Sequence, residues 1–136
     1  MNPELAHQSD QGAAIKAPIS PTGILNDAFR KQQQSLPLNG TKHAKGRTVI
    51  TQGLNAMPPD VFVGVIAAVQ AFDTFDKDDD PYGDHDFGAL TIPGLDEKIF
   101  WKIDVYADAS CEWGAENPAD PDNSFRVLTV MLASEY

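Results

Sequence analysis

Residues 125–133 (FRVLTVMLA) limit the fold more than any other segment, because they are apolar on both faces. A strand without a polar face must be covered by protein on both sides. In a chain of 136 residues, such a strand has to lie inside a sheet rather than at its edge. The sequence therefore predicts a sheet built around this C-terminal segment.

Three further segments have strand patterns. Residues 97–106 alternate, with Ile99, Trp101 and Ile103 on one face and polar or aromatic residues on the other. Residues 87–92 form a short apolar run closed by a Pro-Gly turn, and residues 47–54 are rich in β-branched residues. We expect about four strands.

Two segments have helical patterns. Residues 23–34 carry apolar side chains on one side, and residues 61–72 are apolar nearly all round, which is typical of a buried core helix. The element order predicts an α+β fold over residues 22–136, a single domain with two helices packed on a mainly antiparallel sheet. Residues 1–21 are polar and aperiodic, so we expect a flexible N-terminal arm.

Composition and targeting signals indicate a protein of the cytoplasm. Apolar residues make up 42% of the chain, enough for a core, and the single cysteine, Cys111, cannot form an internal disulfide. The N-terminus has no signal-peptide pattern. The longest apolar stretch, residues 61–72, is shorter than the roughly 20 residues that a membrane span needs. We therefore expect no membrane partner.

The net charge of −10 is unevenly distributed. Residues 1–72 carry +2 and residues 73–136 carry −12, and the densest part, residues 73–86, holds seven Asp and one Lys. Direct binding to nucleic acid requires clustered Lys and Arg, so we expect none. An acidic surface instead attracts basic proteins.

Three sequence blocks carry a resemblance to a known family. They are DDDPYGDHDFG (78–88), FWKIDVY (100–106) and RVLTVMLASEY (126–136). LNDAFR (25–30), TVITQGL (48–54) and AVQAFDTF (68–75) fit the leading half in the same order. Over residues 22–136 the chain resembles the DUF3768 family. The resemblance implies a small bacterial, plasmid or phage protein of unknown function, and it supplies no catalytic residue.

The candidate site is the acidic connection between the core helix and the sheet. Its candidate binding residues, together with one position of the following strand, are Asp78, Asp79, Asp80, Tyr82, Asp84, His85, Asp86 and Asp104. Asp80, Asp84, His85 and Asp86 are also candidate ligands for a divalent metal, because carboxylates and one imidazole suit such an ion.

Two observations weaken the metal interpretation. An EF-hand loop requires Gly where this chain has Pro81 and Glu where it has Phe87. The segment DPYG (80–83) is also a turn sequence, beside which Asp and His often cap backbone N–H groups. A structural role for these residues therefore stays open.

Three functional hypotheses follow. The first is an acidic, non-enzymatic protein-binding module, such as an inhibitor or nucleic-acid mimic that acts on a basic host defence protein in a mobile-element setting. The second is a small metal-dependent hydrolase that uses residues 78–86 and a divalent ion as its only cofactor. The third is an accessory protein whose acidic loop maintains solubility. We favour the first, because no complete catalytic motif is present in the sequence.

Overall fold

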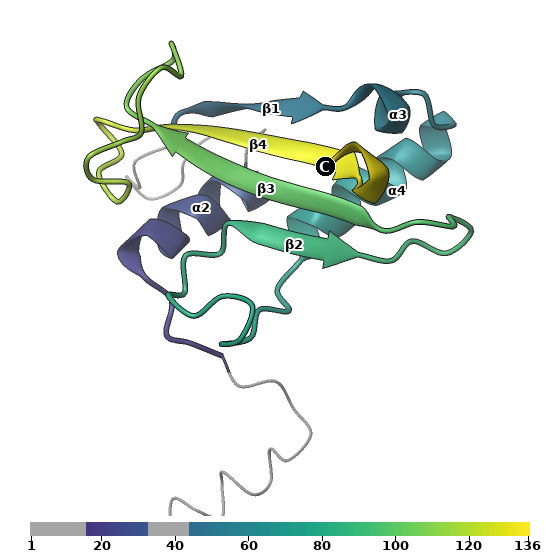
Figure 1. Ribbon diagram of the computed structural model, residues 1–136, viewed down its shortest axis with the longest axis horizontal. Helices are drawn as coiled ribbons and strands as arrows, with labels where there is room; N and C mark the ends of the chain where they lie inside the picture. Colours follow the sequence, from purple (N-terminus) through teal and green to yellow (C-terminus); the bar gives the residue numbers. More distant parts are fainter. Residues whose placement is uncertain (1–15, 33–43) are drawn as a thin grey trace, which may run out of the picture.

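One four-stranded mixed sheet organises the computed structural model, which describes residues 16–32 and 44–136 (Figure 1). In order across the sheet, the strands are β1 (Gly46–Ile50), β4 (Phe125–Leu132), β3 (Ile99–Tyr106) and β2 (Phe87–Leu90). The β1–β4 pair is parallel, and the β4–β3 and β3–β2 pairs are antiparallel. The C-terminal strand therefore lies inside the sheet, as its sequence predicts.

Strand β4 is buried on both faces. Leu128 and Val130 face the helices, and Val127 and Met131 on the opposite face are also buried. Trp101 of β3 lies opposite Val130 and is fully buried. The prediction from the apolar C-terminal segment is confirmed.

Two helices cover one face of this sheet, behind it in Figure 1. They are α2 (Pro21–Gln32) and α4 (Pro59–Ala71). Phe29 of α2 and Val65 and Val69 of α4 pack in the same core as Trp101. The predicted α+β class, with two helices on a mainly antiparallel sheet, is confirmed.

The predicted strand over residues 47–54 is too long. Strand β1 ends at Ile50, and Gln52–Asn55 form the one-turn helix α3. The carboxylate of Glu135 binds the start of this helix, because it accepts hydrogen bonds from the Thr51 hydroxyl (2.6 Å) and the Gly53 N–H (2.8 Å). These contacts lower the pKa of Glu135. Glu135 lies 82 positions from Gly53 in the sequence, so no local sequence pattern predicts this cap.

The prediction that the central helix is buried all round is wrong. Only Val65 and Val69 of α4 are buried, while Val63 is 65% exposed. The helix forms the outer layer of a two-layer structure, so the sheet covers only one side of it. Within the described residues, no helix is long and apolar enough to cross a membrane.

A buried arginine joins strand, helix and loop. Arg126 of β4 is fully buried and donates to the side-chain oxygen of Asn26 (2.7 Å), the hydroxyl of Ser124 (2.9 Å) and the carbonyl of Pro118. Burial lowers the pKa of Arg126 to about 10, so the guanidinium stays charged at neutral pH. A buried charge is tolerated only when its donors are paired, which these three acceptors achieve.

Gly46 lies where β1 and β4 approach closely under α2. A Cβ at this position would lie 2.2 Å from the Arg126 carbonyl oxygen and 2.8 Å from the Phe29 ring. We expect Gly46→Ala to lower the free energy of unfolding by about 1–3 kcal/mol, through overpacking. Urea denaturation measures this change.

The matched control is Gly64→Ala in α4, where a Cβ meets nothing within 4 Å. Alanine is the better helix former, so we expect this variant to be more stable by about 0.5–1 kcal/mol. Equal denaturation midpoints for the two variants would contradict the packing at Gly46.

Candidate functional site

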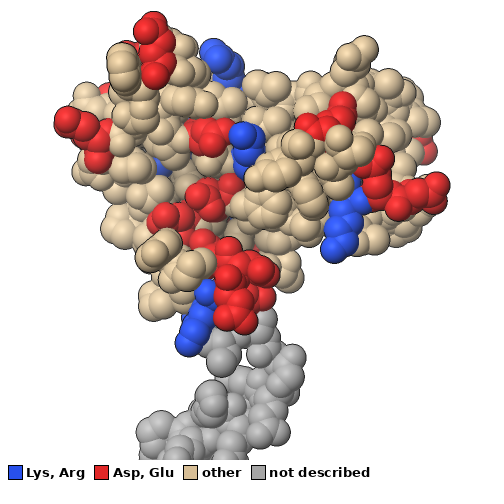
Figure 2. Space-filling model, viewed as in Figure 1, with Lys and Arg blue, Asp and Glu red and all other residues tan. Residues whose placement is uncertain are grey.

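The acidic loop, residues 73–86, connects α4 to β2. It runs along the side of β2 that faces away from β3, and Figure 2 shows its carboxylates gathered on the surface there. Its first turn is closed by Asp76, whose carboxylate accepts the N–H groups of Asp78 and Asp79 at 2.9 Å each. The nearby Asp76 charge raises the pKa of Asp79. The side chains of Asp78 and Asp79 are exposed.

The second turn of the loop is held by Asp80. One of its carboxylate oxygens accepts N–H groups from both Asp84 (3.1 Å) and His85 (3.3 Å). Gly83 and His85 have φ values of +70° and +51°, in the left-handed region. Glycine enters this region readily, whereas histidine does so at a cost that surrounding contacts must offset.

His85 receives those contacts from α2 and from the acidic loop itself. Its Nδ1 lies 3.0 Å from both carboxylate oxygens of Asp27, and its Nε2 lies 3.6 Å from Asp80. Its ring stacks on Phe75 with centroids 3.8 Å apart and an interplanar angle of 7°. The side chain is only 13% exposed. His85 therefore links the acidic loop to α2 and to the core.

Arg30 continues this network into the core. The fully buried guanidinium lies 3.0 Å from Asp27, donates to the Val69 carbonyl at 2.7 Å, and sits 4.6 Å from the centroid of the Trp101 ring. Burial lowers the pKa of Arg30, and the Asp27 charge opposes that shift. Asp27 thus shares its carboxylate between a buried cation and His85.

Asp84 is anchored from the other side of the loop. Its carboxylate accepts the Ser20 hydroxyl at 2.6 Å, and its carbonyl accepts the side-chain amide of Asn26 at 2.8 Å. Ser20 also donates its backbone N–H to the Gly83 carbonyl at 3.0 Å. Of the expected arm, residues 1–15 lie outside the described residues, whereas Ser20 is part of the packed structure.

The eight candidate residues therefore separate into two groups. Asp80, Asp84 and His85 use their side chains to fasten the loop, in the structural role that the turn sequence left open. Five others reach solvent, wholly or in part: Asp78, Asp79, Tyr82, Asp86 and Asp104. Tyr82 is 80% exposed.

Asp86 and Asp104 form a second acidic position. Partial loss of solvent and the charges of Asp84, Asp80 and Asp104 raise the pKa of Asp86. Asp104 lies on the face of β3 opposite the helices, where it pairs with Lys102 at 3.1 Å. His85 packs on the helix side, so Asp104 and His85 do not form one site.

The metal candidates do not form a ligand set. Across residues 16–32 and 44–136, no three His, Cys, Asp or Glu side chains are grouped so that they could hold a metal ion. The reason is that Asp80, Asp84 and His85 are directed to backbone amides, Ser20 and Asp27.

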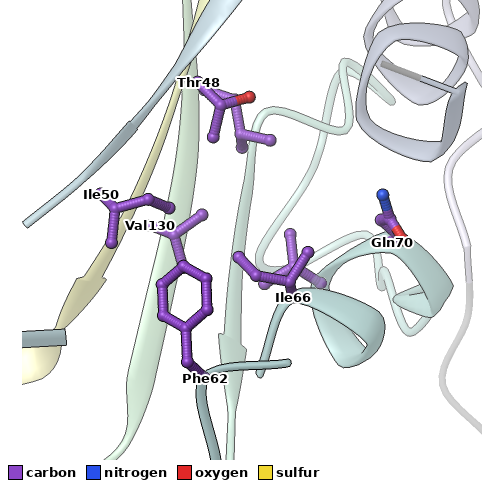
Figure 3. Close-up of a pocket in the computed structure, with 8 residues that line it drawn as sticks. Thr48, Ile50, Phe62, Ile66, Gln70 and Val130 are labelled. Carbon is purple, nitrogen blue, oxygen red and sulfur yellow. The ribbon is translucent and has the colours of Figure 1, made fainter. Parts of the chain in front are cut away.

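Two features of the structure, one beside the acidic loop and one away from it, were not predicted from the sequence. One is the ion pair between Asp27 and Arg30. Their spacing of three residues on the inner side of a helix is the sequence pattern that could have indicated it. The other is an apolar pocket of about 260 Å³ between α4 and strands β1 and β4 (Figure 3). Phe62 and Ile66 of α4 line it, opposite Ile50 and Val130.

A family model described as a protein of unknown function, DUF3768, matches residues 50–135. The chain belongs to the DUF3768 family. The match begins at the last residue of β1 and includes α4, the acidic loop and the other three strands. No curated protein and no solved structure matches this DUF3768 chain. Asp27 and Arg30, which anchor the loop, lie before the matched region.

The loop anchor can be tested by removing one carboxylate. In Asp80→Ala, the N–H groups of Asp84 and His85 lose their acceptor, and we expect the free energy of unfolding to fall by about 1–3 kcal/mol. Chemical denaturation measures the loss, and hydrogen exchange of the two amides should become faster.

The control is Asp78→Ala, which removes the same charge from an exposed side chain of the same loop. We expect a change of no more than about 0.5 kcal/mol. If both variants unfold at the same denaturant concentration, Asp80 is not the anchor of the loop.

Proposed function

We propose that this DUF3768 chain is a non-enzymatic protein-binding module that engages a basic protein through its acidic surface. We define the acidic surface as the exposed side chains of Asp78, Asp79, Asp86 and Tyr82 together with the half-buried Asp104. The observation that carries the proposal is that two groups of side chains in the loop have different roles. Asp76, Asp80, Asp84 and His85 fix its backbone, whereas Asp78, Asp79 and Asp86 are exposed to solvent.

Fixed carboxylates favour binding for two reasons. A pre-organised loop loses little conformational entropy when a partner docks, so more of the interaction energy appears as affinity. Clustered negative charge also accelerates the encounter with basic partners and repels nucleic acid and anionic membrane. The charge of Asp76 raises the pKa of Asp79, and partial burial together with the charges of Asp84, Asp80 and Asp104 raises the pKa of Asp86. A cationic partner would offset the repulsive part of both shifts.

The family resemblance suggests a setting for this activity. A small acidic protein of a plasmid or phage can occupy the nucleic-acid-binding surface of a basic host defence protein, acting as an inhibitor in the cytoplasm. The alternative of a metal-dependent hydrolase has less support. Among the described residues, no three His, Cys, Asp or Glu side chains are grouped so that they could hold a metal ion.

Salt dependence tests the proposal. With fluorescent poly-L-lysine as the probe, we expect the dissociation constant to rise steeply between 50 and 500 mM salt, because exposed charges are screened. Asp78→Asn/Asp79→Asn should weaken binding severalfold at low salt, since each exposed ion pair contributes about 0.2–1 kcal/mol. Fluorescence anisotropy measures both effects.

The matched control removes two charges elsewhere. Glu112→Gln/Glu116→Gln changes the net charge by the same amount in the exposed segment between β3 and β4. We expect this variant to bind nearly as well as the unmodified chain. Equal weakening by the two double variants would mean that net charge, and not the acidic surface, attracts the probe.

A further inference from the structure

Strand β2 is an edge strand with unpaired backbone groups. The N–H of Ile103 donates to the carbonyl of Asp86 at 2.8 Å, and hydrogen-bonded pairs alternate along an antiparallel ladder. Gly88 and Leu90 therefore direct their backbone groups toward β3. Phe87 and Ala89 direct theirs away from the sheet, where no described strand pairs with them.

A groove of about 490 Å³ lies along this free edge. One wall is β2 itself, from Phe87 to Ala89, and the other is the acidic loop, with Asp78, Asp79 and Asp80. Phe72, Thr74 and Phe75 complete the lining. The loop thus stands beside the edge strand without pairing with it, and Figure 1 shows this arrangement below β2.

An unsatisfied donor lies behind Gly88, one of the residues that line the groove. The Trp101 side chain is fully buried, and its indole N–H has no acceptor among the described residues. The indole nitrogen lies against Gly88, since a Cβ at residue 88 would be only 2.3 Å away from it. The buried indole N–H therefore packs directly behind the backbone of the edge strand.

The two sides of the edge differ in chemistry. The side chains of β2 that lie opposite the helices belong to an aromatic cluster, in which the Phe87 ring lies 5.3 Å from Phe100 and 6.1 Å from Tyr136. The groove side carries carboxylates. An added strand with alternating apolar and basic residues would match both, because successive side chains of a strand point to opposite faces.

We propose that an extended basic segment of the partner protein adds to the sheet as a fifth strand beside β2. Its backbone pairs with Phe87 and Ala89, its basic side chains meet Asp78 and Asp79, and its apolar side chains contact the aromatic cluster. Strand addition of this kind derives affinity from main-chain hydrogen bonds and specificity from alternate side chains. The inference rests on the proposed function and specifies how the acidic surface binds.

The test uses the full chain and a labelled peptide, acetyl-KVKVKVKV-amide. The variant Ala89→Pro removes one outward N–H, and proline is tolerated on an edge strand. We expect the peptide to bind this variant about tenfold more weakly, because the variant cannot make the hydrogen bond that the Ala89 N–H would donate to the peptide. A peptide of the same charge with N-methylated central backbone nitrogens should bind weakly to both proteins.

Hydrogen exchange of the unmodified chain keeps the test independent of how well the proline variant folds. We expect the amides of Phe87 and Ala89 to exchange more slowly when KVKVKVKV is bound. Unchanged exchange at both amides, with salt-dependent binding that still requires Asp78 and Asp79, would overturn strand addition and leave the proposed function standing. Failure of both peptides and of poly-L-lysine to bind at 50 mM salt would overturn the proposed function itself.

Discussion

The side-chain amide of Asn26 is the interaction on which the rest of the structure depends. Its oxygen accepts from buried Arg126 on β4, and its nitrogen donates to the Asp84 carbonyl in the acidic loop. An amide supplies an acceptor and a donor from one rigid plane, so it fixes strand, helix and loop relative to one another. Replacing it with an apolar residue would leave a buried guanidinium short of an acceptor, which is far more costly than the loss of one ordinary hydrogen bond.

The fold was largely predictable because it follows from periodicity. The alternation over residues 97–106 and the continuous apolar run near the C-terminus define the two central strands, and both are correct. The errors come from long-range contacts. Helix α3 is capped by Glu135, which is distant in the sequence. Val63 on α4 is exposed because the structure has only two layers, and the number of layers cannot be predicted from local sequence patterns.

The candidate site was predictable in position but not in internal organisation. Charge density located the acidic loop, and the turn sequence left open the capping of backbone amides that Asp80 performs. The sequence gives no indication that His85 stacks on Phe75 or lies between Asp27 and Asp80, because Asp27 is separated from it by 58 positions. The free edge of β2 likewise depends on strand order, which becomes visible only when all four strands are placed.

The parallel pairing of β1 with β4 has a consequence for biosynthesis. Gly46 pairs with Arg126, so β1 has no partner until the ribosome has added 80 further residues. At the usual rate of about 5–20 residues per second, this interval lasts roughly 4–16 s. During that time no completed sheet covers the inner side of α4, which carries Val65 and Val69. The sheet therefore closes only after β4 has been synthesised, because this strand enters the middle of the sheet.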